Sequence, residues 1–130
     1  MKKLLFKFLI LAVAAGVVVG CKTAPVYNVE GQTIVTNVEN VKMDDVKKAI
    51  IRGGASLNWV MKVDKPGHIV GTLNLRNHMA QVDINYTAKS YSITYKDSKE
   101  LNYDGSNIHS NYNGWIQNLQ RNIDVQLSTM

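Results

Sequence analysis

Cysteine occurs only once in this 130-residue chain, as Cys21. One cysteine allows no disulfide within the chain and no zinc site built from several thiolates. Stability must therefore come from a hydrophobic core, and residues 21–130 have the ordinary size of a single domain. The chain also lacks internal repeats and low-complexity tracts.

Neither basic nor acidic residues form a cluster in the sequence after residue 20. The formal net charge is +5, but three of the fifteen basic residues lie within the first seven positions. Residues 21–130 carry the other 12 basic side chains and all 10 acidic ones, a net charge of +2. Nucleic-acid-binding proteins present clustered basic residues, so we expect no nucleic-acid partner.

The N-terminus has the order of a secretory signal. Three lysines precede an almost purely apolar run at 8–20, which ends in Gly20 and is followed by Cys21. A basic start, a short apolar run and a small residue before the cleavage point are typical of such signals. A membrane-spanning helix needs about 20 apolar residues, more than this run provides. We predict that residues 1–20 are a signal peptide whose removal leaves Cys21 as the first residue.

The four residues Val18-Val19-Gly20-Cys21 resemble the lipobox of bacterial lipoproteins, in which the cysteine thiol receives a diacylglyceryl group before cleavage. Two valines stand where Leu and a smaller residue are more common. The resemblance implies that Cys21 is lipidated and holds the protein in the cell envelope. Several acyl chains on one cysteine anchor a domain durably, because each buried CH₂ contributes about 0.8 kcal/mol. By the same resemblance, Lys22 after the cysteine implies the outer membrane, with the domain facing the periplasm.

The segment after the lipidation point is predicted to be a tether. Residues 22–41 mix Thr, Asn, Glu and Gly with isolated Val, Ile and Tyr. The alternative is a short edge strand at 33–36. We therefore divide the mature chain into a lipidated N-terminus and tether at 21–42 and a single domain at 43–130.

Two helices are predicted, one at each end of this domain. Apolar residues recur every three to four positions at 43–53 and again at about 111–127. Two aspartates in the first turn of the earlier helix suit the positive end of its dipole. Gly53-Gly54 is expected to end that helix, because glycine accepts the left-handed conformation common after a helix end.

Between the helices the apolar residues alternate with polar ones in four segments, which predicts an antiparallel meander. The expected turns are at 65–67, 77–78 and 88–89, and Gly71 is expected to leave room for a helix to approach. A slip of one residue would send each apolar set to the wrong face. The predicted opposite pairs are Trp59–Leu73, Met61–Gly71, Val63–Ile69, Asp64–His68, Ile69–Tyr86, Gly71–Ile84, Leu73–Val82, Leu75–Ala80, Val82–Tyr95, Ile84–Ile93 and Tyr86–Tyr91.

These elements predict an α+β fold. Only one sheet face is apolar, so both helices are expected to pack on that face. The architecture is then a two-layer sandwich of a four-stranded antiparallel meander sheet with an N-terminal and a C-terminal helix on one side.

No metal or cofactor site is expected. His68 and His78 lie at opposite ends of one predicted strand, too far apart to share a metal at about 3.3 Å per residue. We expect both to be solvated turn residues. A hydrolase would have to use Ser98 or Ser110 with His109 and Asp97 or Asp104, but no nucleophile-elbow pattern surrounds either serine.

The polar segment 101–113 is the first choice for a binding site, because loops on rigid scaffolds commonly carry function. Four aromatic residues (Tyr86, Tyr91, Tyr95 and Trp115) are expected to fill the core. Two tyrosines flanked by asparagines are freer to bind a partner. The candidate binding residues are Tyr103, Asp104, His109, Tyr112 and, on the polar sheet face, Arg76.

Three stretches, GHIVGTLNLR at 67–76, YSITYKDS at 91–98 and LNYDG at 101–105, are similar to short uncharacterised lipoproteins of Gram-negative bacteria. The positions Ile108, His109, Tyr112, Asn113 and Trp115 extend this similarity. It covers most of the mature chain and implies an envelope location and one compact domain. It implies no substrate, cofactor or catalytic residue.

The leading hypothesis is a non-enzymatic envelope lipoprotein that docks another envelope protein, peptidoglycan or a small ligand. The alternative is an envelope hydrolase that uses the 97–113 loop. A purely architectural protein without a discrete site is a third possibility.

Overall fold

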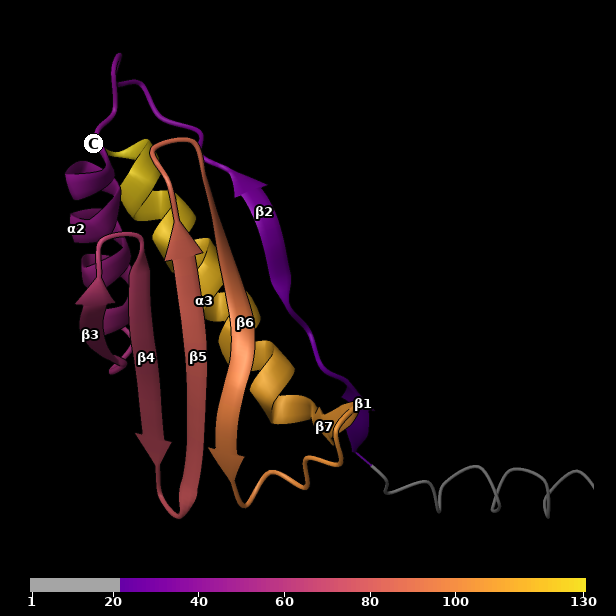
Figure 1. Cartoon of the computed structure of the whole chain (residues 1–130). Coiled ribbons are helices and arrows are strands. Elements are labelled where there is room, and N and C mark those ends of the chain that lie inside the picture. Colours follow the sequence, from indigo (N-terminus) through magenta and orange to yellow (C-terminus); the bar gives the residue numbers. More distant parts are fainter. Residues whose placement is uncertain (1–21) are drawn as a thin grey trace, which may run out of the picture.

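A five-stranded antiparallel sheet with two helices on one face forms the main part of the fold (Figure 1). The structure is a computed structural model that describes residues 22–130, so the predicted signal peptide and Cys21 lie outside the described residues. The sheet order is β2-β6-β5-β4-β3, and β1 pairs with β7 in a separate two-stranded sheet. The elements are β1 (Thr23–Pro25), β2 (Val29–Thr33), α2 (Met43–Ala55), β3 (Val60–Lys65), β4 (His68–Leu75), β5 (His78–Tyr86), β6 (Ser90–Lys99), β7 (Asn107–His109) and α3 (Ser110–Ser128).

The predicted α+β class is confirmed, but the sheet has five strands rather than four. The fifth strand is β2, which pairs with β6 and lies in the segment expected to be a tether. That segment also contains β1, so the tether prediction is wrong for 23–33. Both strands are short and mostly exposed, and Val29 is the only buried residue of β2. They therefore lack the alternation by which a strand is recognised, and pairing with distant strands holds them in place.

The register of the sheet agrees with the prediction for two of its three hairpins. Strands β3 and β4 place Met61 opposite Gly71, and β5 and β6 place Tyr86 opposite Tyr91. Between β4 and β5 the turn is one residue earlier than expected, at 76–77, and the pairing is shifted by two. Arg76 adopts a left-handed conformation with φ 58° there. A shift of two keeps every side chain on its predicted face.

The pairs of the shifted hairpin are therefore corrected. They are Ile69–Ile84, Gly71–Val82, Leu73–Ala80 and Leu75–His78. Trp59 precedes β3, so its predicted pairing with Leu73 is not part of the ladder.

The glycines of α2 do not end the helix, which continues to Ala55. Both are buried within its last turns, and a Cβ on Gly53 would lie 3.0 Å from the Cα of Ile123. Gly54 is in contact with the side chain of Met61. Gly53 and Gly54 therefore let α2 approach α3 and β3 closely, which corrects their predicted role as terminators.

Gly71 also has a different role from the one predicted. A Cβ at this position would lie 3.0 Å from Sδ of Met61 and 3.2 Å from Cγ2 of Val82. The space above Gly71 is thus filled by side chains of the neighbouring strands and not by a helix.

The core lies between the sheet and the two helices. Helix α3 contributes the apolar face expected from its spacing, except that Trp115 is only partly buried. In α2 the buried face contains Ala49, whereas Met43 at the start of the helix is 40% exposed. The buried hydrophobic residues are Val29, Val46, Ala49, Ile50, Trp59, Ile69, Leu73, Ala80, Val82, Ile84, Tyr86, Tyr91, Ile93, Leu101, Ile108, Tyr112, Ile116, Leu119, Ile123 and Leu127.

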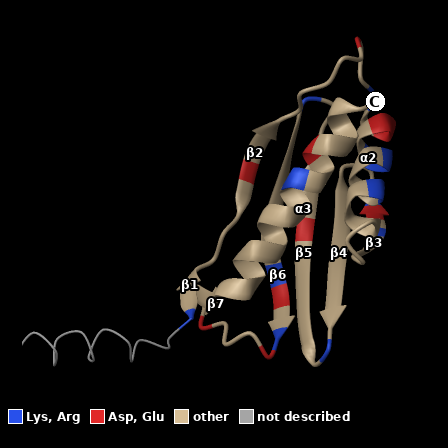
Figure 2. Ribbon diagram, turned by 180° about the vertical axis from the view of Figure 1, so that it is seen from behind, with Lys and Arg blue, Asp and Glu red and all other residues tan. Residues whose placement is uncertain are grey.

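None of the helices in residues 22–130 has both the length and the hydrophobicity that crossing a membrane requires. Basic and acidic residues are scattered over the ribbon and do not collect on one side (Figure 2).

Candidate functional site

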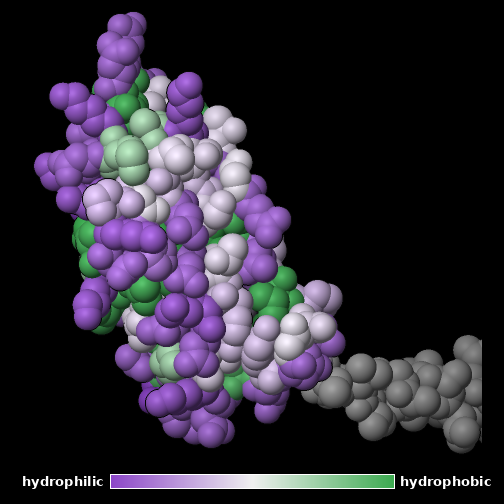
Figure 3. Space-filling view, in the orientation of Figure 1, coloured by the Kyte–Doolittle hydropathy of each residue, from purple (hydrophilic) through white to green (hydrophobic). Residues whose placement is uncertain are grey.

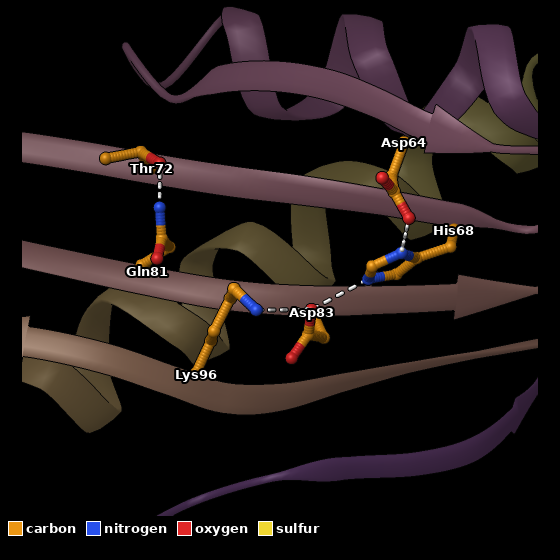
Figure 4. Close-up of polar contacts among 6 residues, drawn as sticks. All are labelled: Asp64, His68, Thr72, Gln81, Asp83 and Lys96. Carbon is orange, nitrogen blue, oxygen red and sulfur yellow. Dashed lines mark hydrogen bonds and ion pairs between the residues drawn. The ribbon is translucent and has the colours of Figure 1, made fainter.

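The sheet face turned away from the helices is largely hydrophilic (Figure 3). An ion-paired network lies on it, centred on His68 at the start of β4 (Figure 4). Its Nδ1 is 2.9 Å from Oδ2 of Asp64, and its Nε2 is 2.7 Å from Oδ1 of Asp83. The Nζ atom of Lys96 is 3.7 Å from the same Asp83 oxygen. Two basic side chains and two carboxylates from four adjacent strands thus form the network.

A bulge in β3 places Asp64 beside His68. The register passes from Val63–Ile69 to Lys65–His68, so Asp64 is the extra residue on β3. Bulges re-aim side chains in this way. The predicted direct pairing of Asp64 with His68 is therefore replaced by a side-chain contact.

Both ring nitrogens of His68 face a carboxylate, so the imidazolium form, in which both nitrogens donate, fits the site best. The hydrogen bond with Asp64, followed by that with Asp83, raises the pKa of His68 above its usual value of 6.5. The hydrogen bond with His68 in turn lowers the pKa of Asp64. The side chain of His68 is only 17% exposed, so the prediction of a solvated turn histidine is wrong for this residue.

The predicted binding segment 101–113 is a loop only up to residue 106, because β7 begins at Asn107 and α3 at Ser110. Tyr103 is 41% exposed, and its ring stacks on that of Tyr95 with 4.0 Å between the ring centroids. The Asp104 carboxylate accepts hydrogen bonds from the backbone N–H groups of Asn107 at 2.7 Å and Ser106 at 2.9 Å. These bonds lower the pKa of Asp104. Asp104 therefore stabilises the turn itself.

The other predicted binding residues are dispersed. Nδ1 of His109 accepts the backbone N–H of Asn111 at 3.2 Å and thereby caps α3. Tyr112 is 1% exposed, and burial raises the pKa of its hydroxyl. Its ring meets the edge of Tyr95 at a centroid distance of 5.8 Å, so it belongs to the core and not to a surface. Arg76 is exposed in the β4–β5 turn.

A cleft of about 370 Å³ lies beside α3, between the α2–β3 connection and the end of β4. Pockets of this size, mainly apolar with a few polar groups, are typical of small-ligand sites. Both tryptophans of the chain line it, together with three leucines and three asparagines, and no charged side chain is among these residues. The lining consists of Leu57, Asn58, Trp59, Leu73, Asn74, Leu75, Trp115 and Asn118.

Sequence reasoning did not find this cleft, because tryptophans at apolar positions of a strand and a helix are ordinary core residues. The partial burial of Trp115 depends on how α3 crosses the end of β4. Leu75 at that end is 45% exposed.

Within residues 22–130, no group of three or more His, Cys, Asp or Glu side chains is arranged to hold a metal ion. Comparison of the chain with protein-family models, curated proteins and solved structures gives no match.

Proposed function

We propose that this chain is a lipid-anchored protein of the bacterial cell envelope whose domain binds a ligand rather than catalysing a reaction. The anchor is the lipid on Cys21, and the domain faces the periplasm from the outer membrane. The order of residues 1–21 and the resemblance to small Gram-negative lipoproteins support this proposal.

Metabolic labelling with radioactive palmitate tests the anchor. We expect the wild-type protein to incorporate label and to partition into the membrane fraction. The Cys21→Ser variant is expected to lose both properties, since serine offers no thiol for acylation. An unlabelled wild-type protein, or a variant that stays equally membrane-bound, would contradict lipid anchoring.

The cleft at Trp59 and Trp115 is the observation that carries the binding function. Indole rings offer apolar area, and the three asparagine amides offer both donors and acceptors. A neutral ligand with an apolar face and several hydroxyl or amide groups, such as a sugar ring, matches this lining. In the envelope, the glycan part of peptidoglycan has this chemistry.

Intrinsic fluorescence reports directly on this cleft, because both tryptophans of the chain line it. Titration of the protein with soluble peptidoglycan glycan fragments is expected to change the emission saturably. The double variant Asn74→Ala/Asn118→Ala removes two amides without touching a fluorophore, and we expect it to bind at least tenfold more weakly, a loss of about 1.4 kcal/mol. Asn85→Ala on the outer sheet face is the control and should bind like the wild type. A wild-type emission that does not respond to the fragments would refute this ligand class.

An envelope hydrolase using the 97–113 loop is the alternative. It requires His109 within reach of an Asp carboxylate and a Ser hydroxyl. Among the described residues, the His109 ring forms no ion pair or hydrogen bond with either type of side chain, and its Nδ1 caps α3. This geometry lends the hydrolase alternative no support, and binding remains the proposed function.

A further inference from the structure

We infer that one end of the domain rests directly on the bilayer, so that the anchored protein has a single orientation. We call it the anchor end and define it as residues 22–25, the β4–β5 turn at 76–77 and residues 100–109. This inference rests on the proposed lipidation of Cys21, and it adds which surface the lipid headgroups contact.

The chain enters the fold at the residue after Cys21. The carbonyl oxygen of Lys22 accepts the backbone N–H of Ser110 at 2.7 Å, and Thr23 pairs with His109 in the β1–β7 ladder. Consecutive Cα atoms are about 3.8 Å apart. A lipidated Cys21 would therefore hold its acyl chains within one residue of a fixed backbone position.

Residues 25–27 are hydrogen-bonded to α3 and to the residue before β7, so this segment cannot act as a tether. The side-chain oxygen of Asn113 accepts the backbone N–H of Tyr27 at 2.9 Å, and its NH₂ group donates to the carbonyl of Pro25 at 2.9 Å. The N–H of Val26 donates to the carbonyl of Ser106 at 3.0 Å. A flexible linker of 20 residues would reach about 25 Å and permit any orientation, whereas this segment permits little rotation.

The β4–β5 turn and the β6–β7 loop lie at the same end as the point where the chain leaves the described domain (Figure 1). His78, next to the turn, is joined to the loop by its Nδ1, which is 2.7 Å from the carbonyl oxygen of Glu100. Exposed side chains here include Tyr103, two basic residues (Lys22 and Arg76) and two acidic ones (Glu100 and Asp104), so the charges of this end balance. Tyrosine suits the headgroup layer, and a surface without net charge is not repelled by anionic lipids, so the fixed entry of the chain and not charge carries the orientation.

This orientation also determines how far the cleft at Trp59 and Trp115 lies from the membrane. Leu75, which lines it, immediately precedes the turn residue Arg76 of the anchor end. The turns at 66–67 and 87–89 lie at the far end of the sheet, about 30 Å away, since β6 has ten residues that rise about 3.3 Å each. The cleft therefore opens close to the membrane surface.

Fluorescence quenching in vesicles tests this orientation with the full lipidated chain. Cys21 is the only cysteine and is blocked by lipid, so a cysteine introduced elsewhere provides the single thiol for a fluorophore. We compare Tyr103→Cys and Ser106→Cys at the anchor end with Lys89→Cys at the far end, all at exposed positions. The vesicles contain phosphatidylethanolamine, phosphatidylglycerol and a headgroup spin-labelled phosphatidylcholine.

We expect loss of emission from both anchor-end labels and unchanged emission from the Lys89→Cys label. Flotation of the same samples separates the two proposals. Protein that floats with the vesicles but shows equal quenching at both ends, or none at the anchor end, overturns the orientation and leaves the anchor intact. Protein that does not float overturns lipid anchoring and the orientation with it.

Discussion

The Nε2 atom of His68 lies 2.7 Å from Oδ1 of Asp83 on the polar face of the sheet. Its other ring nitrogen, Nδ1, lies 2.9 Å from Oδ2 of Asp64. The pKa of His68 is raised in the folded state, so folding and protonation favour each other. The resulting stability is fully present below the ordinary histidine pKa of 6.5 and is lost as the pH rises through the folded-state value above it.

We predict that His68→Gln lowers the free energy of unfolding at pH 5.5 by about 1 kcal/mol, the scale of a partly exposed ion pair. At pH 9 the loss should be smaller, because less of the wild-type His68 is protonated there than at pH 5.5. Urea unfolding at both pH values measures the difference. His78→Gln is the control, since His78 has a backbone carbonyl and no carboxylate as its partner. A His68→Gln variant with the wild-type pH dependence would contradict the role of the network.

The contact between α2 and α3 depends on the missing side chain of Gly53. Alanine is normally the better helix residue by about 1 kcal/mol. At Gly53, however, the new Cβ would lie 3.0 Å from the backbone of Ile123. We predict that Gly53→Ala destabilises the protein by about 1–3 kcal/mol, as overpacking does.

Gly114→Ala is the matched control for this prediction. It is also within a helix, and a Cβ there would meet nothing within 4 Å. We expect it to raise the free energy of unfolding by about 0.5–1 kcal/mol. In thermal unfolding, we expect Gly53→Ala to lower the midpoint temperature and Gly114→Ala to raise it. Shifts of the same sign would refute the interpretation that Gly53 permits the close approach of α2 and α3.

Two equally buried tyrosines differ in their hydrogen bonds. The hydroxyl of Tyr91 donates to Oδ1 of Asp124 at 2.6 Å, whereas among the described residues that of Tyr112 forms no hydrogen bond with a carboxylate. Hydrogen bonds to charged groups contribute about 1.5–3 kcal/mol. We predict that Tyr91→Phe costs about 2 kcal/mol in chemical unfolding and that Tyr112→Phe costs much less. An equal loss of unfolding free energy in the two variants would contradict a stabilising role for the hydrogen bond between Tyr91 and Asp124.

Asn113 fastens the N-terminal segment with two hydrogen bonds. We predict that Asn113→Ala increases hydrogen exchange in residues 23–33 while the protection of β4 and β5 is unchanged. Exchange measured by mass spectrometry on peptides resolves these regions. Asn111→Ala, at an exposed position of the same helix turn, should leave the exchange of 23–33 as it is in the wild type.

Long periodic segments were predictable from the sequence because their side-chain patterns are determined locally. Both helices and the β5–β6 register follow from such patterns. Strand β2 has no such signal, since its place depends on pairing with β6. The β4–β5 turn was misplaced because Arg76 adopts a φ of 58° that arginine seldom takes.

The candidate sites were less predictable, because they depend on tertiary contacts. The bulge at Asp64 creates the His68 network, and nothing in the local sequence indicates it. Tyr112 is next to polar residues in the chain but is buried against Tyr95 in the fold. The cleft exists only where α3 passes the end of β4, and the apolar spacing of Trp115 by itself indicates only a core residue.

Intact-mass spectrometry of the detergent-extracted protein tests lipid anchoring most directly. The expected species is a chain that begins at Cys21 and carries diacylglyceryl and further acyl mass on that residue alone. A chain that begins elsewhere, or one that begins at Cys21 without added lipid, would contradict the proposed anchor.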